Sequence, residues 1–306
     1  MMPDICDYED STYRTDFWEG QNRDYEDRVE RIALHRLMPK SGHRLLELGA
    51  GFGRLTNEFE AYDQVVLLDY SRSQLEYARQ QYGDDGFIYV AANIYQMPFA
   101  PGLFDVATMI RVLHHMQEPA KALLAVRDIM GADGVFILEY ANKQNIKAIA
   151  RWLLRQQTWS PFEQEPVEFV TLNYNFHPKH VRTLLREVGF EPGRQLTVSH
   201  FRMDVLKRLV PAGILATLDA GAQLTGNLWQ LAPSVFTQSR AAGDTVETPV
   251  DAFWKCPTCG SLALSETVNS VDCEECGTRW AIVNGVYDFK EPIKKGGQLE
   301  ADHPVS

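Results

Sequence analysis

Residues 45–55, LLELGAGFGRL, restrict the possible fold more than any other stretch of the chain. An apolar run that predicts a buried strand leads into Gly49, Gly51 and Gly53, and one carboxylate, Glu47, stands just before them. Glycine lets the backbone come close to a ligand because it has no Cβ. A helix that follows such a turn directs its N-terminal N–H groups at the same ligand. The stretch therefore predicts a strand, a ligand-binding turn and a helix, in that order.

A second carboxylate, Asp69, ends the next predicted strand, twenty residues after Gly49. An acidic residue at that distance suits the two hydroxyls of a ribose, which indicates an adenosine-type cofactor. A dinucleotide fingerprint would require a third glycine at position 54, where this chain has Arg54. Glu47 would also repel a pyrophosphate but attract an ammonium or a sulfonium group. These residues favour S-adenosylmethionine over a nicotinamide dinucleotide.

Apolar strand-like segments and helical segments alternate along most of the chain. Strands are predicted at 44–49, 65–70, 87–92, 104–110, 134–140, 194–201 and 233–239. Helices are predicted at 12–38, 54–62, 71–83, 119–130 and 177–189, with Ser71 as an N-cap and Gly83 as a helix stop. This alternation predicts an α/β fold with a mostly parallel sheet and helices on both faces. Ligands bind such sheets at the carboxyl ends of the strands.

Composition shifts divide the chain into segments. We expect a helical entry at 1–40, a cofactor-binding domain at 41–239 with insertions at 141–177 and 202–232, a linker at 240–252, a small cysteine-rich domain at 253–291 and a disordered tail at 292–306. The linker has few apolar residues, and the tail has the composition of an unstructured terminus.

The charge distribution narrows the choice of partners and location. A net charge of -11 argues against general nucleic-acid binding. Residues 1–30 hold ten acids against three bases, whereas residues 141–240 hold twelve bases against seven acids. The acidic start lacks the apolar segment of a signal peptide, and no run approaches the ~18 apolar residues of a membrane span. We therefore expect a cytoplasmic protein, with peripheral membrane contact as an open alternative.

The motifs resemble those of class I S-adenosylmethionine-dependent methyltransferases. LLELGAGFGRL is similar to their first motif, VVLLDYS to their second, and AANIYQMPFAPGLFDVATMIRVLHHM to the region that follows. The resemblance is good over 40–140 and looser over 141–239, and it is closest to the small-molecule, ubiquinone/menaquinone-type branch. It implies a Rossmann-like sheet of seven mostly parallel strands.

The resemblance also implies roles for individual residues. The residues expected to hold the methionine part of the cofactor are Glu47, Gly49, Ala50, Gly51 and Gly53; those expected at the ribose and adenine are Asp69, Tyr70, Asn93 and Ile94; and those expected beside the methyl group are Ile110 and Arg111. Asn93 departs from the aspartate that is usual there. Its amide oxygen still accepts a hydrogen bond, so we expect weaker adenine binding rather than none.

The segment after the fourth strand, MIRVLHHM, bears on the acceptor. It lacks both the N-P-P-Y type of motif used on nucleic-acid bases and a Pro-Cys nucleophile. A small-molecule or lipid-like acceptor is therefore favoured, DNA is disfavoured, and RNA stays possible but not favoured. The candidate catalytic residues are Arg111, His114, His115, Glu139 and Tyr140. For the two histidines, packing beneath the loop is the preferred alternative to a role as base.

The first insertion contains a basic pattern. Lys143, Lys147, Arg151 and Arg155 recur every four residues, which predicts one basic face on a helix. Such a helix either lies on an anionic membrane or holds an acidic substrate. The more common alternative is a solvated charged face opposite an apolar stripe that faces the core.

Four cysteines near the C-terminus form a separate motif. Cys256, Cys259, Cys273 and Cys276 have the spacing C-x2-C-x13-C-x2-C, which predicts a structural zinc site with four thiolates. Residues 279–289 predict two strands joined by a turn at 284–285. The unit resembles small zinc-ribbon proteins that activate methyltransferases, although Trp280 and Ala281 depart from the pattern. We expect it to be structural, activating or substrate-docking.

Three functions fit these observations. The preferred one is an S-adenosylmethionine-dependent methyltransferase that acts on O, C or N of a small or lipid-like acceptor. The second is an RNA methyltransferase that uses the ribbon and the basic insertions to hold RNA. The third is a regulatory protein that binds the cofactor without turnover.

Overall fold

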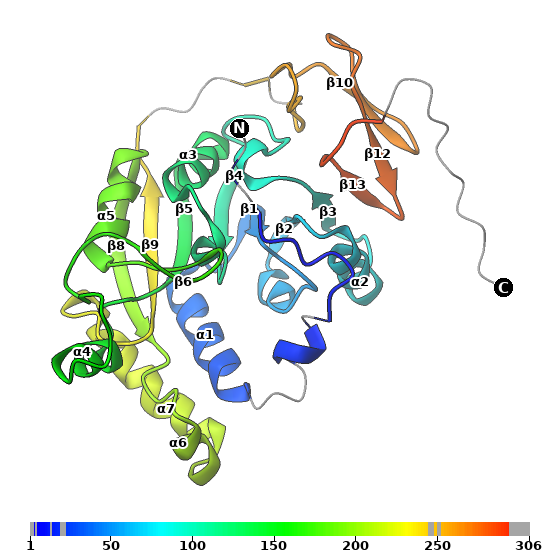
Figure 1. Cartoon of the computed structure of the whole chain (residues 1–306). Coiled ribbons are helices and arrows are strands. Elements are labelled where there is room, and N and C mark those ends of the chain that lie inside the picture. Colours follow the sequence, from blue (N-terminus) through cyan, green and yellow to red (C-terminus); the bar gives the residue numbers. More distant parts are fainter. Residues whose placement is uncertain are drawn as a thin grey trace.

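The computed structural model describes residues 3, 5–12, 14–18, 23–243, 248–249 and 252–293. Its centre is an α/β sheet, which confirms the predicted fold class (Figure 1). Seven of its strands are β1 (Gly42–Leu48), β2 (Tyr62–Asp69), β3 (Phe87–Ala91), β4 (Phe104–Met109), β5 (Met130–Ala141), β8 (Phe190–Val198) and β9 (Ser234–Ala241), in the order β3-β2-β1-β4-β5-β9-β8. Strands β1 to β5 pair in parallel, and β9 is antiparallel to both β5 and β8.

Helices cover both faces of this sheet. They are α1 (Asp24–Leu37), α2 (Arg72–Tyr82), α3 (Pro119–Ile129) and α5 (Pro178–Glu187). Neighbouring side chains of β1 point to opposite faces of the sheet. Accordingly, Leu46 belongs to one buried hydrophobic cluster and Leu45 to another. The predicted ends of α2 are confirmed: Ser71 Oγ accepts from Gln74 N at 3.4 Å, and Gly83 has φ 74°.

Two helical expectations need correction. The helix predicted at 54–62 is only the 3₁₀ helix η2 (Thr56–Phe59). Of the entry predicted at 12–38, the structure describes a π-helical turn, η1 (Arg14–Trp18), and α1, whereas residues 13 and 19–22 lie outside the described residues. Side-chain contacts account for the first difference, since Arg31 of α1 donates from Nη2 to the Arg54 carbonyl at 2.6 Å and so engages the backbone that a longer helix would use itself.

The two insertions pack differently. The first contains α4 (Ile146–Leu153) and a hairpin of β6 (Val167–Val170) and β7 (Asn173–Asn175); the second contains α6 (Asp204–Leu209), α7 (Ala212–Ala222) and η5 (Gln223–Asn227). The second packs against α1, where Tyr25 Oη donates to the buried Asp219 Oδ2 at 2.6 Å. Lys143 does not belong to the predicted basic helix face. It precedes α4, is buried, and donates from Nζ to the Glu165 carbonyl at 2.7 Å.

The four-cysteine region, residues 252–293 and hereafter the cysteine unit, joins the same sheet. It contains the antiparallel strands β10 (Leu264–Glu266), β11 (Ser270–Cys273), β12 (Arg279–Val283) and β13 (Val286–Asp288). The predicted turn is confirmed, with positive φ at Asn284 and Gly285. β13 pairs in parallel with β3, which makes one eleven-stranded sheet (Figure 1). Residues 244–247 and 250–251 of the expected linker, and 294–306 of the expected tail, lie outside the described residues.

Candidate cofactor-binding site

The glycine turn closes against the end of β2. The N–H groups of Gly49 and Ala50 both donate to the Leu68 carbonyl, at 2.8 and 3.0 Å. Gly49 has φ 69°, and a Cβ there would lie 2.2 Å from Cγ2 of Val112. Gly51 has φ 53° and open space where its Cβ would stand. Packing therefore requires glycine at position 49, whereas Gly51 presents a backbone without a side chain to a cavity.

That cavity gathers most of the predicted cofactor residues at the carboxyl ends of the strands. Those that line it are Glu47, Gly49, Ala50, Gly51, Asp69, Tyr70, Ile94, Ile110 and Arg111. Two others do not line it. The Gly53 carbonyl accepts from Tyr82 Oη at 2.8 Å, and Asn93 Oδ1 accepts from Tyr95 N at 2.9 Å, where it caps η3 (Ile94–Gln96). Both shape the loops around the cavity instead of facing it.

Asp69 is held in place by main-chain donors. Its Oδ2 accepts from Gly51 N and its Oδ1 from Ser71 N, both at 2.8 Å. Burial raises the pKa of Asp69, and these N–H groups act in the opposite direction. The turn and the start of α2 thus fix one carboxylate at the cavity wall.

Glu47 is the second carboxylate at the cavity, and it is 5% exposed. Its Oε2 accepts from Thr56 Oγ1 at 3.1 Å. Burial raises the pKa of Glu47 to about 8. A cationic group in the cavity would stabilise the ionised form, so the site suits a ligand with an ammonium or sulfonium centre.

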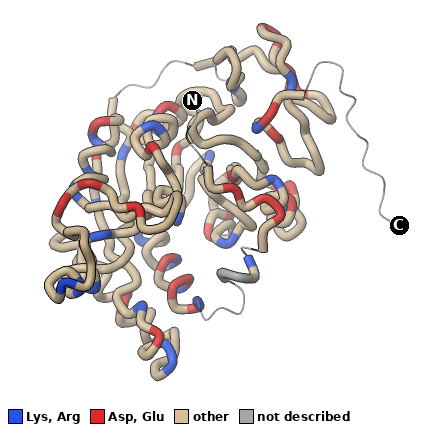
Figure 2. The backbone as a smooth tube through the Cα atoms, in the orientation of Figure 1, with Lys and Arg blue, Asp and Glu red and all other residues tan. Residues whose placement is uncertain are grey.

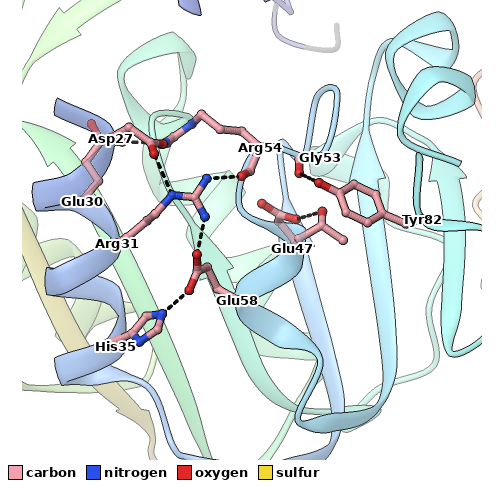
Figure 3. Close-up of polar contacts among 10 residues, drawn as sticks. Asp27, Glu30, Arg31, His35, Glu47, Gly53, Arg54, Glu58 and Tyr82 are labelled. Atoms are coloured by element: carbon pink, nitrogen blue, oxygen red, sulfur yellow. Dashed lines mark hydrogen bonds and ion pairs between the residues drawn. The ribbon is translucent and has the colours of Figure 1, made fainter. Parts of the chain in front are cut away.

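Charged side chains of α1 brace the glycine turn from behind (Figure 3). Arg54 donates to Asp27 Oδ1 at 2.5 Å and to Glu30 Oε2 at 2.6 Å. Arg31 donates from Nε to Asp27 Oδ2 at 2.7 Å and also binds Glu58. This network connects α1 to Arg54, at the C-terminal end of the turn, and to Glu58 of η2.

A tryptophan and two arginines form one side of the cavity. The Cζ atoms of Arg54 and Arg111 lie 3.9 and 5.3 Å from the ring centroid of Trp18, within cation–π range. Arg111 has φ 62°, and its N–H donates to Glu139 Oε2 at 2.9 Å. Its Nη1 is 3.4 Å from Glu30 Oε1. Arg111 is thus oriented from its backbone and from α1.

Glu139 and Tyr140 do not reach the cavity, contrary to expectation. Glu139 is buried and also accepts from Ser234 Oγ at 2.5 Å, so it supports Arg111 and the end of β9. Tyr140 lies fully buried in the hydrophobic core. Successive strand residues point to opposite faces, so these two neighbours could not both face one pocket.

Of the two histidines, only His115 lines the cavity. Both lie in the 3₁₀ helix η4 (Leu113–His115). His115 Nδ1 is 3.0 Å from the Leu172 carbonyl, and because a carbonyl only accepts, Nδ1 carries the proton. Nε2 is then an acceptor, 3.4 Å from Tyr8 Oη. Burial lowers the pKa of His115, and burial lowers the pKa of His114 further still.

The N-terminal residues at the cavity were not predicted from the sequence. Ile5, Cys6 and Tyr8 line the cavity together with Trp18. Residues 5–12, hereafter the N-terminal strap, carry acidic and polar residues without helical or strand periodicity. No local pattern signals that such a segment returns to a site built from residues 45–116. Only its one aromatic residue, Tyr8, offered a hint.

The four cysteines meet as the spacing predicts. Their Sγ atoms lie within 4.8 Å of one another, with Cys256–Cys276 at 3.7 Å and Cys259–Cys273 at 3.6 Å. Thiolates at ~2.3 Å from a tetrahedral zinc ion would be about 3.8 Å apart. The cluster therefore has the donor set and spacing of a four-thiolate metal site.

Comparison with known proteins agrees with this geometry. The sequence model described as "Methyltransferase domain" matches residues 46–138. The ubiquinone/menaquinone biosynthesis C-methyltransferase UbiE of Photorhabdus laumondii is 30% identical over 180 residues, which are 53% of this chain and 72% of that protein. The chain belongs to the S-adenosylmethionine-dependent methyltransferase family.

Other relatives match this methyltransferase over a shorter length. UbiE of Vibrio parahaemolyticus is 34% identical over 111 residues, 33% of this chain and 43% of that protein. The chain thus spans less than half the length of such relatives.

Two solved structures share the methyltransferase fold at low identity. One is an S-adenosylmethionine-dependent methyltransferase from Mesorhizobium loti, with 21% identity and a TM-score of 0.50, covering 69% of this chain and 97% of that one. The other is a chain of the Haloferax volcanii complex between the Trm112 methyltransferase activator and a methyltransferase, with 16% identity, a TM-score of 0.51, and coverage of 74% and 95%. At these identities the likeness concerns the fold alone.

Proposed function

We propose that this chain binds S-adenosylmethionine in the cavity at the glycine turn and transfers its methyl group to a small-molecule or lipid-like acceptor. The observation that carries the proposal is the pair of carboxylates in the cavity wall, the buried Glu47 and the partly exposed Asp69, on either side of a bare backbone turn. The names of the relatives, which refer to ubiquinone and menaquinone biosynthesis, support a quinone-type acceptor class. The acceptor atom within O, C or N stays open.

The roles of the residues follow from their positions. Glu47 would face the cationic methionine part of the cofactor, Asp69 the ribose hydroxyls, and Tyr70 and Ile94 the adenine. Bound there, the cofactor supplies an electrophilic methyl group on a positively charged sulfur. Ile110 and Arg111 would border that group, and the apolar cavity wall would keep water away from it.

Methyl transfer requires alignment of the acceptor and, for a protonated nucleophile, removal of a proton. His115 is the candidate base that this cavity favours, because its Nδ1–H is held by the Leu172 carbonyl and its Nε2 is left as an acceptor. His114 does not line the cavity. Arg111 would orient an anionic or carbonyl oxygen of the acceptor.

The cysteine cluster fits a structural Zn²⁺ ion held by Cys256, Cys259, Cys273 and Cys276. Two of these thiols are buried. The unit pairs with the edge of β3, so a stabilising or activating role within the chain is better supported than docking of RNA. Its balance of seven acids to three bases over 251–291 is also unfavourable for RNA.

A titration with S-adenosylmethionine tests the proposal directly. We expect binding that Asp69→Ala weakens by ~1.5–3 kcal/mol, the range for hydrogen bonds to a charged group. Asp63→Ala is the matched control, since Asp63 lies on the same strand with a side chain that is 75% exposed. Product formation is then assayed with quinone-type acceptors, bulk lipid and RNA. Binding of a nicotinamide dinucleotide instead would contradict the proposal, and cofactor binding without product in any fraction would favour the regulatory alternative.

Membrane contact through α4 is the second part of the proposal. Among the described residues no helix is both long and apolar enough to cross a bilayer. α4, however, turns its apolar side outward: Ala148 is buried, whereas Ile146 and Leu153 are 65% and 67% exposed. The basic residues Lys147 and Arg151 of the same helix are also exposed. Figure 2 marks basic positions in blue on the segment at the lower left, where Figure 1 labels α4. An apolar helix face with flanking cations suits the surface of an anionic membrane, where a lipid-like acceptor resides.

Vesicle flotation tests whether α4 is the surface that contacts the membrane. We expect the chain to float with vesicles that contain phosphatidylglycerol, and the double variant Ile146→Glu, Leu153→Glu to lose most of that binding. Val268→Glu is the control, because Val268 is 89% exposed in the cysteine unit. Equal flotation of all three proteins would contradict membrane contact through α4. If the wild-type chain forms a dimer and the double variant does not, the partner that covers the apolar face of α4 is a second copy of the chain.

A further inference from the structure

A side chain of the cysteine unit, Lys290, contacts a residue of the cavity wall. Lys290 is the second residue after β13 and is placed by that strand's pairing, since the intervening Phe289 donates from its backbone N to the Ala91 carbonyl at 2.8 Å. Its ammonium lies 5.4 Å from the ring centroid of Tyr70, which lines the cavity. Lys290 of the cysteine unit thus lies next to Tyr70, one of the residues proposed to face the adenine of the cofactor.

The same ammonium contacts the N-terminal strap. Lys290 Nζ is 3.0 Å from Glu9 Oε2, and the Lys290 side chain is 18% exposed. The Glu9 carboxylate also accepts from the backbone N–H groups of Arg72 and Ser73 at the start of α2, both at 2.9 Å. Glu9 therefore joins three elements: the strap, α2 and the cysteine unit.

The charge state of Glu9 agrees with this role. Burial alone would raise its pKa, but Lys290 and the two N–H groups lower the pKa of Glu9 to about 2. The carboxylate is therefore ionised near neutral pH, so the contact with Lys290 is an ion pair. A pair that keeps some solvent exposure contributes a modest free energy.

The strap that Glu9 fastens covers part of the cavity. Ile5, Cys6 and Tyr8 line it, and Tyr8 Oη reaches His115 Nε2 at 3.4 Å. If the strap is released, the cofactor loses these wall residues, and ordering them again opposes binding. Holding the strap in place beforehand removes that cost.

We propose that Lys290 is a positioning residue for cofactor binding, and that through Glu9 it couples the metal-bound, folded cysteine unit to the affinity of the cavity. The inference rests on the proposed function for the identity of the cofactor. Coupling between two sites is reciprocal, so cofactor binding also raises the affinity of the cysteine cluster for its metal.

Affinity for S-adenosylmethionine in Lys290→Met, Glu9→Gln and the double variant tests the positioning role. We expect each single change to weaken binding about fivefold, the size of a partly exposed ion pair, and the double variant to be no weaker than the worse single one. Lys255→Met is the matched control, because Lys255 belongs to the cysteine unit but, among the described contacts, Tyr70 and Glu9 are met by Lys290 and not by Lys255. Wild-type affinity in Lys290→Met would overturn the proposal.

A chelator tests the coupling to the metal. Removal of metal should weaken cofactor binding in the wild-type protein and weaken it less in Lys290→Met, where the connection is already cut. Equal weakening in the two proteins would overturn the coupling.

Amide hydrogen exchange tests the role of Lys290 independently of the proposed function. Exchange in residues 5–12 should be faster in Lys290→Met than in Lys255→Met even without cofactor. If the wild-type protein binds no S-adenosylmethionine, the proposed function fails while this readout still tests the strap. If the wild-type protein binds and exchange in the strap is unchanged, the inference alone fails.

Discussion

At the scale of the residue, Glu47 sets a pH dependence with opposite signs for stability and for binding. Its pKa in the folded protein is raised to about 8 by burial, above the ~4.3 of an unfolded chain. The stability that Glu47 contributes is therefore fully present below pH ~4.3 and is lost as the pH rises through about 8. A cationic cofactor needs the ionised form, so its affinity should rise over the same interval.

Calorimetry between pH 6 and 8 checks the binding part of this prediction. We expect the Kd for S-adenosylmethionine to fall as the pH rises, by at most about tenfold per pH unit, with proton release visible in buffers of different ionisation enthalpy. Glu47→Gln should bind weakly and without this slope. An affinity that is flat over the interval in the wild-type protein would contradict the role of Glu47.

Two glycines of the same turn should respond differently to a single methyl group. In Gly49→Ala the new Cβ would lie 2.2 Å from Val112 Cγ2 in a left-handed conformation, so we expect a loss of about 2–4 kcal/mol in unfolding free energy. In Gly51→Ala the Cβ meets no atom within 4 Å, so the loss should be only ~1 kcal/mol, with cofactor affinity reduced instead. Denaturant unfolding and calorimetry on both variants measure the contrast. Equal loss of stability would contradict it.

At the scale of the element, α1 holds the glycine turn by charge. Arg31 donates to Asp27, Glu58 and the Arg54 carbonyl, and its side chain is 27% exposed. Arg31→Met leaves these acceptors without their donor, so we expect a loss of about 2 kcal/mol in unfolding free energy and a weaker affinity for the cofactor.

Arg28→Met is the matched control for Arg31→Met, because Arg28 is exposed on the same helix. We expect its unfolding free energy to stay within about 0.5 kcal/mol of the wild-type value. A similar loss in both variants would show that the network of Figure 3 does not brace the turn.

At the scale of the whole molecule, we expect the cysteine unit to stabilise the other seven strands of the sheet, β1 to β5, β8 and β9, hereafter the catalytic sheet. The unit covers the β3 edge through β13, and Val286 at that contact is fully buried. Cys273→Ser removes one thiolate from the cluster, so we expect loss of bound zinc and a thermal midpoint lowered by roughly 5–10 °C. Zinc content and scanning calorimetry measure both.

Cys6→Ser is the control for Cys273→Ser, because Cys6 lies in the strap and outside the four-cysteine cluster. It should keep one zinc ion per chain and the wild-type midpoint. If Cys273→Ser loses zinc while the catalytic sheet unfolds at the wild-type temperature, the sheet does not depend on the unit.

Local sequence was enough for the strands β1 to β5, β8 and β9, for the glycine turn and for the ends of α2, but not for β6, β7, β10 and β11. Ser71 and Gly83 act within a few residues of their own positions, and the alternation of apolar and polar residues depends on the period of each element. The spacing of the four cysteines likewise predicted the thiol cluster, since each knuckle is a local turn. These features follow from short-range geometry, which the sequence carries directly.

What the tertiary structure alone decided concerns contacts between residues far apart in the chain. Lys290 meets Glu9 across 281 positions, and the strap reaches a cavity built from later strands. Periodicity on α4 predicted an amphipathic helix, but the side that faces solvent depends on what packs beneath it, and there the apolar side faces outward. A sequence pattern states which residues share a face, whereas burial is a property of the neighbours that the fold supplies.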